Sequence, residues 1–186
     1  MQIDEQRFLD LAERSGALAF VDIESTGLTA DYNNLLVVSI KPYEEEAYSF
    51  VIKQAGNDQR VVREAKEALE QYELWVTYYG KGFDIGFMNT RLLKWGQKPI
   101  EKRPHLDLFY SLKYNTRMSR KSLAHFGRWL KCDESKMDMS PDDWIEAAAN
   151  PSGPVMKKMV QRCESDCLLT ENLYKKTRHL VRSITK

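Results

Sequence analysis

Apolar positions along the chain change their spacing several times, and each change predicts a separate element. Residues 3–15 place apolar side chains at helical spacing, and Gly16 follows as a stop signal. Residues 17–23 are a run of apolar, mostly strand-favouring residues, which is typical of a buried strand. Residues 35–40 and 47–52 are two further runs, joined by a short acidic segment. This short connection predicts that the first three strands are antiparallel neighbours.

Helical and strand patterns alternate from residue 60 onward. Helical spacing covers 60–73 and 84–95, with an apolar run at 74–79 between them. A strand segment at 104–108 precedes the remaining predicted helices, near 108–115, at 119–131, from Pro141 after the capping residue Ser140, and over 154–182. Three meander strands followed by alternating helices and strands predict an α/β layered domain.

Two acids end the first apolar run, just before a Ser-Thr-Gly turn. Asp22 and Glu24 stand two positions apart, so on a strand their side chains point to the same face. Neighbouring carboxylates on a buried strand repel each other and are costly to desolvate, and a cation between them offsets that cost. Because Mg²⁺ and Mn²⁺ prefer hard oxygen ligands, the pair predicts a metal site. The alternative is a solvated strand end.

Three further acids fall at positions that suit the same edge of the sheet. Asp84 follows a glycine-rich turn after the run at 74–79, and Asp107 lies in the segment at 104–108, where a short strand could become a helix. Capping of a helix N-terminus is the alternative for both residues. Asp166 lies within the last predicted helix, on the side of its apolar residues, where an acid is rare without a partner.

Together these motifs resemble the DEDD superfamily of 3′–5′ exonucleases, which has the ribonuclease-H-like fold that proofreading domains also use. The resemblance covers residues 17–180 and rests on Asp22-Ile23-Glu24-Ser25-Thr26-Gly27-Leu28, on Tyr79-Gly80-Lys81-Gly82-Phe83-Asp84, and on Asp166 with Leu169 and Leu173-Tyr174. It implies a mixed five-stranded sheet with helices on both faces, in which an antiparallel meander comes first and parallel strands follow.

The resemblance also implies the site. Asp22, Glu24, Asp84 and Asp166 would hold two divalent cations, Mg²⁺ or Mn²⁺, and carry out phosphodiester hydrolysis. His105-Leu106-Asp107 resembles a segment that some members have between the second and third motifs, so Asp107 is a secondary candidate.

The chain departs from this family at the general base. Members usually carry Tyr four residues, or His five residues, before the last Asp, whereas this chain has Arg162 and Gln161 there. Neither side chain accepts a proton at neutral pH. We therefore expect Arg162 to hold Asp166 or a substrate phosphate. His125 is the best-placed histidine to supply a base instead, and a partly buried polar role is its alternative.

Charge is divided unevenly along the 186 residues, although the net charge is only +1. Residues 98–131 hold nine Lys/Arg against two Asp/Glu, and residues 151–186 hold eight against three, whereas residues 1–97 hold ten against sixteen. This division suits an anionic polymer lying on basic helices with its reactive phosphate over the acids. Solvated helix faces of mixed sign are the alternative. The candidate nucleic-acid contacts combine aromatic and basic side chains: Tyr110, Lys113, Arg117, Arg120 and Lys121.

The remaining composition limits the class of protein. An odd number of cysteines without framework spacing and a first segment unlike a signal peptide predict a cytoplasmic location. We expect the three cysteines and the four tryptophans in the core rather than at zinc or base-stacking sites. No run of eighteen apolar residues occurs, which excludes a membrane span. The length predicts one domain over 1–186, with an N-terminal helix at 1–16 and a core at 17–182.

The sequence thus predicts a metal-dependent 3′–5′ exonuclease acting on single-stranded ends, with the polarity taken from the resemblance. A catalytically weak or inactive nucleic-acid-binding scaffold is one alternative, and an α/β interaction module with incidental acids is another. Four retained acids favour the enzyme, because a scaffold gains nothing from clustered carboxylates. DNA and RNA stay open as substrates, since no residue pattern indicates a contact to the 2′-hydroxyl.

Overall fold

One mixed sheet organises the computed structural model, which describes residues 4–132, 138–181 and 184. The five strands lie in the order β3-β2-β1-β4-β5. They are β1 (Leu18–Ser25), β2 (Leu35–Pro42), β3 (Tyr48–Val51), β4 (Leu74–Thr77) and β5 (His105–Asp107). β2 pairs antiparallel with both β1 and β3, whereas β4 pairs parallel with both β1 and β5. The predicted sheet, an antiparallel meander followed by parallel strands, is confirmed.

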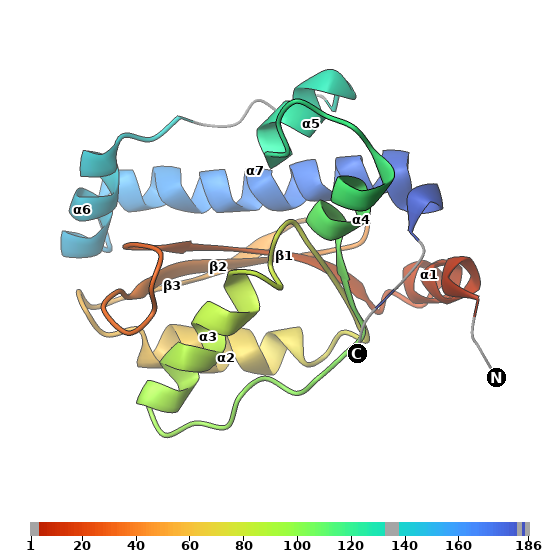
Figure 1. Ribbon diagram of the computed structural model, residues 1–186. Coiled ribbons are helices and arrows are strands. Elements are labelled where there is room, and N and C mark those ends of the chain that lie inside the picture. The colour runs from red at the N-terminus through yellow and green to blue at the C-terminus, as the bar shows by residue number, and fades with distance from the viewer. Residues whose placement is uncertain (1–3, 133–137, 182–183, 185–186) are drawn as a thin grey trace.

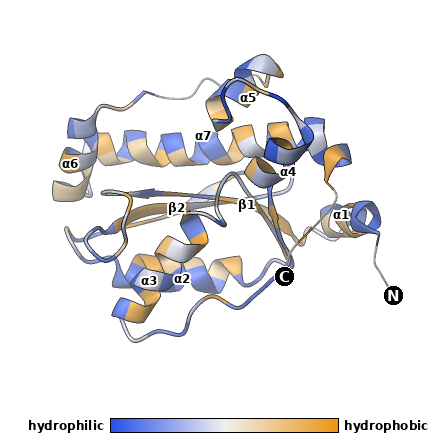
Figure 2. Ribbon diagram, viewed as in Figure 1, coloured by the Kyte–Doolittle hydropathy of each residue, from blue (hydrophilic) through white to orange (hydrophobic). Residues whose placement is uncertain are grey.

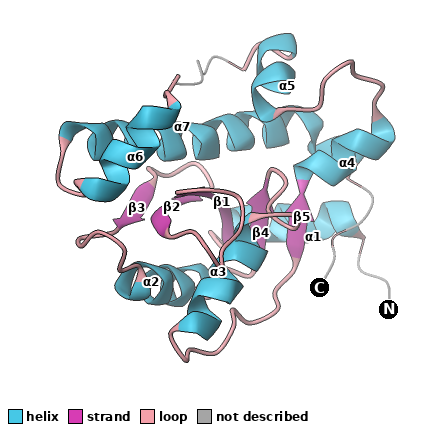
Figure 3. Cartoon of the chain, turned by 60° about the vertical axis from the view of Figure 1, so that its left-hand side comes forward, coloured by secondary structure: helices cyan, strands magenta, loops and turns pink. Residues whose placement is uncertain are grey.

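Helices cover both faces of this sheet, as predicted. They are α1 (Glu5–Arg14), α2 (Gln59–Leu69), α3 (Asp84–Lys94), α4 (Leu108–Asn115), α5 (Leu123–Trp129), α6 (Pro141–Ala149) and α7 (Pro154–Thr177), followed by the 3₁₀ turn η1 (Arg178–Leu180). Helices α2 and α3 lie on one face, and α7 crosses the other face with α4, α5 and α6 on its side (Figure 1, Figure 3). Even α7 is too polar for a bilayer, and no helix in the described residues has the length and apolar character of a membrane span.

The alternation of side chains along β1 explains how the two faces form. Leu18 and Phe20 pack into an apolar cluster that includes residues of α1, α4, α5 and α7. Val21 and Ile23 belong to a second cluster that includes the apolar faces of α2 and α3. Figure 2 shows apolar stretches along the strands, with helices of mixed apolar and polar residues on both sides of the sheet. Because the period is two, Asp22 follows Phe20 onto the α7 face.

Several helices differ at their ends from the predicted spans, and the helix predicted over 60–73 stops at Leu69. The helix predicted at 119–131 begins only after Ser122, whose extended backbone and side chain form the N-cap. It ends before Lys131, which has a left-handed φ of 52°. The helix predicted over 154–182 stops at Thr177, and its expected last residue lies outside the described residues, as does Ile3 of the first predicted helix.

Expectations about buried residues are met for the cysteines and in part for the tryptophans. Cys132, Cys163 and Cys167 are buried free thiols. Trp75 is buried, but Trp129 is 63 % exposed, so its predicted core position is wrong. The helix that carries Trp129 is only seven residues long, and the ring lies at its last position. The predicted extent of a single domain stays a prediction.

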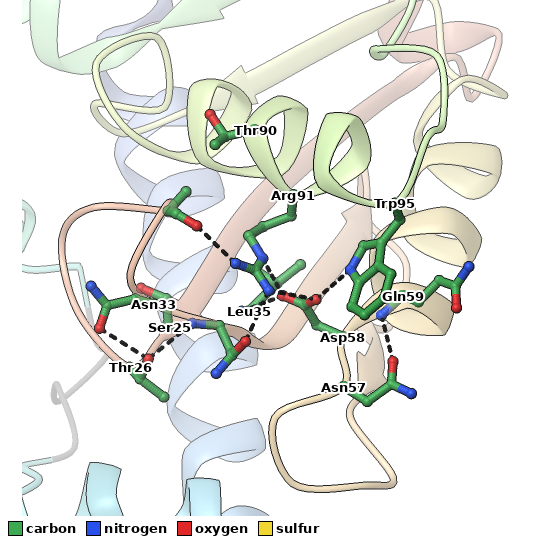
Figure 4. Close-up of polar contacts among 12 residues, drawn as sticks. Ser25, Thr26, Asn33, Leu35, Asn57, Asp58, Gln59, Thr90, Arg91 and Trp95 are labelled. Atoms are coloured by element: carbon green, nitrogen blue, oxygen red, sulfur yellow. Dashed lines mark hydrogen bonds and ion pairs between the residues drawn. The ribbon is translucent and has the colours of Figure 1, made fainter.

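A buried ion pair joins α2, α3 and the start of β2. Arg91 Nε donates to Asp58 Oδ2 at 2.7 Å and Arg91 Nη2 donates to Oδ1 at 3.0 Å, with both side chains almost fully buried. The same carboxylate accepts the backbone N–H of Leu35 and the indole N–H of Trp95, each at 2.8 Å (Figure 4). Every oxygen of this buried charge is therefore paired with donors.

The same guanidinium holds the loop between β1 and β2. Arg91 donates to the carbonyl of Ala30 at 2.8 Å and to the side chain of Asn34 at 2.9 Å. Thr26 closes the loop on itself, because its backbone N–H donates to the carbonyl of Asn34 and its hydroxyl accepts the Asn34 N–H, each at 3.0 Å. The loop leaving the Asp-Ile-Glu strand is thus fixed from the α3 side (Figure 4).

Replacing Arg91 by Met should lower the free energy of unfolding by about 3–5 kcal/mol, because the substitution leaves the Asp58 charge buried without its cation. Urea unfolding followed by circular dichroism measures this change. Arg63→Met is the control, since its side chain is half exposed, and it should change the free energy by no more than about 0.5 kcal/mol. Equal effects of the two substitutions would show that the buried pair does not hold the fold.

Candidate active site

Three carboxylates meet on the α7 face of the sheet. Asp22 and Glu24 come from β1, and Asp166 comes from α7. Each residue offers one carboxylate oxygen, and these three oxygens all lie within 4.8 Å of one another. Glu24 and Asp166 are buried, and Asp22 is half-buried. The two-residue period of β1 places the first two acids together, and the packing of α7 on β1 adds the third. The expectation that Asp22 and Glu24 share a face is confirmed.

Burial and mutual repulsion make this cluster costly without a cation. Loss of hydration raises the pKa of Asp22 well above its usual value, and the charges of Asp84, Asp166 and Glu24 raise it further. Burial also raises the pKa of Glu24, although Arg162 and a hydrogen bond from Trp144 oppose this shift. Clustered hard oxygens that repel one another are the donor set that Mg²⁺ and Mn²⁺ prefer, so the residues fit a divalent cation.

Asp84 lies beside the three acids without joining their group of converging oxygens. It is the first residue of α3 and is buried. Burial raises its pKa to about 7, and the charges of Asp107 and Glu24 contribute to the shift. Among the charges of the described residues, that of Asp84 raises the pKa of Asp22 the most. The structure therefore places the predicted fourth acid next to Asp22, at the carboxyl end of β4.

Arg162 contacts two of the acids from the preceding turn of α7. Its Nε donates to Glu24 Oε1 at 2.7 Å, and its Nη2 lies 3.9 Å from Asp166 Oδ2. The expected contact to Asp166 therefore exists, but the shorter one goes to Glu24, which the sequence did not indicate. Trp144 of α6 covers the guanidinium, with 5.4 Å between the guanidinium carbon and the ring centroid. This tryptophan was expected in the core; it packs against the apolar cluster of the α2–α3 face and also lies at the site.

Asp107 caps backbone groups rather than joining the converging acids. Its carboxylate accepts the N–H groups of Tyr79 at 2.9 Å, Lys81 at 2.9 Å and Phe109 at 3.0 Å. It is thus the N-cap of α4 and also holds the turn that leads into Asp84. The capping alternative explains Asp107, and the described oxygens that converge do not include it.

A cavity of about 480 Å³ opens over Asp22 and Asp166. Two lysines of the basic segment, Lys113 and Lys121, line it, together with the rings of Tyr78, Tyr79, Phe109 and Tyr110. Tyr110, Lys113 and Lys121 of the predicted nucleic-acid contacts therefore lie at the acids. Arg117 and Arg120 are exposed in the following loop and are not among the described residues that line the cavity.

The aromatic wall of this cavity depends on a strained turn. Tyr79 has a left-handed φ of 69°, and its ring centroid lies 4.8 Å from that of Phe109 and 6.0 Å from that of Tyr110. A Cβ on Gly82 would come within 2.5 Å of the Tyr79 ring, so only glycine fits there. Sequence reasoning noted this glycine spacing but assigned no role to Tyr79.

A second cavity, of about 590 Å³, reaches Glu24 from α6 and the β1–β2 loop. Its lining includes Thr26, Leu28, Phe83 and Trp144. Leu28 is largely exposed, and it follows the Ser-Thr-Gly turn that the Arg91 network holds. The acids therefore have an aromatic and basic cavity on one side and a mostly apolar one on the other.

His125 is half-buried in α5 and lies one turn after Lys121 and Ser122. Those two residues and Leu123 line the cavity over the acids, whereas His125 is not among its described lining residues. The structure thus does not bring this histidine to the acids, and its role as a base stays a prediction.

Comparison with known proteins identifies the family. A family model described as the RNase_H superfamily matches residues 19–178, and the chain belongs to that superfamily, which implies a nucleic acid substrate. The family B DNA polymerase from the hyperthermophilic archaeon Pyrobaculum calidifontis has a similar structure, with a TM-score of 0.70 and 14% sequence identity. The alignment covers 87% of this chain and 24% of the polymerase, and at this identity it shows the fold alone. No curated protein sequence matches the chain.

Replacing Asp84 by Asn should stabilise the metal-free protein at neutral pH. Its folded pKa of about 7 lies above the ordinary value of 3.8, so stability is lost as the pH rises through the folded pKa. The stability gain of the variant should grow from about pH 4 to pH 7, reach the order of a few kcal/mol, and then level off. Urea unfolding in chelator at several pH values measures it. Asp142→Asn, an exposed acid of α6, is the control, and an equally flat profile for both variants would contradict the prediction.

Proposed function

We propose that this protein is a metal-dependent 3′–5′ exonuclease that hydrolyses phosphodiester bonds at single-stranded nucleic-acid ends. One observation carries the proposal: Asp22 and Asp166 line a cavity whose other lining residues include four aromatic rings and two lysines. Aromatic rings stack on unpaired bases, and lysines contact backbone phosphates without reading sequence. The superfamily of the chain supports a nucleic acid as substrate.

Asp22, Glu24 and Asp166 are the proposed ligands of divalent cations, with Asp84 as the fourth acid beside them. Two ions, Mg²⁺ or Mn²⁺, are proposed from the resemblance to DEDD exonucleases. When bound, such ions supply a water of lowered pKa and neutralise charge on the phosphate.

The chain's own residues would orient the substrate. Tyr79 and Tyr110 offer ring faces for the terminal bases, and Lys113 and Lys121 lie at the same cavity for phosphates of the strand. Asp107 holds Tyr79 in its left-handed conformation through the backbone N–H. The hydroxyl of Tyr78 donates to the carbonyl of Lys121 at 2.5 Å, which links the two walls. The 3′ polarity is taken from the family resemblance.

A cytoplasmic location belongs to the same proposal. Cys132, Cys163 and Cys167 are free and buried, which suits a reducing compartment.

The experiment is degradation of 5′-labelled single-stranded DNA and RNA in Mn²⁺ or Mg²⁺. Products should shorten stepwise from the 3′ end, and Asp22→Ala should reduce cleavage to background, because it removes one of the converging oxygens. Glu67→Gln, an exposed acid of α2, is the control and should retain full activity. A circular single strand cut as fast as a linear one would contradict an exonuclease. Tight binding of strands without any cleavage would favour the scaffold alternative.

Binding of a labelled single strand tests the cavity separately from cleavage. Lys113→Ala and Lys121→Ala should each lower the slope of log affinity against log salt by about one. Tyr110→Ala should weaken binding by about 1–3 kcal/mol, the typical loss of one base stack. Fluorescence anisotropy at several salt concentrations measures both effects in chelator. Lys53→Ala, an exposed lysine outside the cavity, is the control, and an equal loss in this variant would remove the case for the cavity.

A further inference from the structure

Arg162 lies inside the acid cluster rather than at its edge. Its side chain is 13 % exposed, and those of Glu24 and Asp166 are still less exposed. The guanidinium donates to Glu24 Oε1 and lies within ion-pair distance of Asp166 Oδ2. Two of the three converging carboxylates therefore already have a positive charge beside them, supplied by the chain itself.

Trp144 holds this charge in place. The indole ring covers the Arg162 guanidinium, and Trp144 also donates a hydrogen bond to Glu24. The helix that carries it, α6, begins at a capping box formed by Ser140 and Asp143 and packs against α7. A planar guanidinium stacked on an indole is already ordered, so it loses little side-chain entropy when it pairs with a carboxylate.

A divalent cation at the same acids has to share two of its carboxylates with this fixed charge. Charges of like sign repel strongly in a site that is largely shielded from water. We propose that Arg162 is a built-in counter-ion that competes with the divalent cation for Glu24, so that it sets the affinity of the metal site. This inference rests on the proposed function, because it concerns the same three acids.

Competition of this kind gives Arg162 opposite effects in two states of the protein. In the metal-free state its charge offsets the repulsion among the carboxylates and stabilises the fold. In the metal-bound state the same charge opposes the cation. An arginine with only a structural role would stabilise both states and leave the affinity for the cation unchanged, so the two roles can be separated by measurement.

The test is calorimetric titration of the full chain with Mn²⁺, together with thermal melts in chelator. Arg162→Met removes the charge and keeps most of the side-chain volume, and Arg162→Gln removes the charge but retains a donor to Glu24. Both variants should bind Mn²⁺ at least about tenfold more tightly than the unmodified protein. Arg162→Met should also melt at a lower temperature in chelator.

Lys157→Met is the matched control. It removes one positive charge from an exposed position on the same helix. The affinity of this variant for Mn²⁺ should be unchanged.

Unchanged or weaker Mn²⁺ binding in Arg162→Gln would overturn the competition, and this variant decides the matter if Arg162→Met does not fold. Failure of the unmodified protein and of both variants to bind Mn²⁺ is a different result. It would remove the metal site, and with it the proposed function. Tighter binding in the variants combined with no cleavage by any of them would retain the competition and refute only the exonuclease.

Discussion

Three carboxylates come together where β1 meets α7, two of them buried and one half-buried, and the neighbouring groups of the site have to offset their repulsion. Desolvation and repulsion raise the pKa of Asp22, so the arrangement costs folding free energy unless neighbouring groups offset it. Arg162 and Trp144 support Glu24, and the buried thiol of Cys163 lies 3.4 Å from Asp22 Oδ2 as a donor. A sheet built for stability alone has no need of such a cluster, and perturbed acids at the mouth of a cavity are typical of functional sites.

The two faces of the sheet carry different buried charges: a paired arginine and aspartate on one face, and the cluster of acids on the other. On the α2–α3 face, Arg91 and Asp58 form a fully paired buried network that also fixes the loop after β1. That loop carries Leu28 to the cavity beside Glu24. On the α7 face, charges are left partly unbalanced around Asp22. The Arg91–Asp58 network therefore fixes the loop that follows β1. Because Glu24 lies at the end of β1, the same network helps to position the acids on the other face.

The α/β class and the antiparallel meander could be predicted because their signals are local, whereas the full mixed sheet was implied by the family resemblance. A two-residue period along β1 fixes the face of Asp22 and Glu24, and the meander follows from short connections. The contacts around the acids are not local: Glu24 and Arg162 are 138 positions apart, and no period in the sequence links them. Asp107 illustrates the same limit, because an acid at a strand end suits a ligand and a cap equally until the N–H groups of the β4–α3 turn are placed.

The departure from the DEDD pattern at the base changes what the last helix contributes. Arg162 is permanently charged and cannot accept a proton at neutral pH, so α7 supplies a counter-ion where the resembled family has a base. Tyr78 does not replace that base, because burial raises its pKa and its hydroxyl already donates to the carbonyl of Lys121. The described cavity thus combines carboxylates with aromatic rings and lysines, and a guanidinium stands beside Asp166 where the resembled family has a base. Under the proposed competition, a substitution at position 162 would change the affinity for the cation while the three acids stay the same.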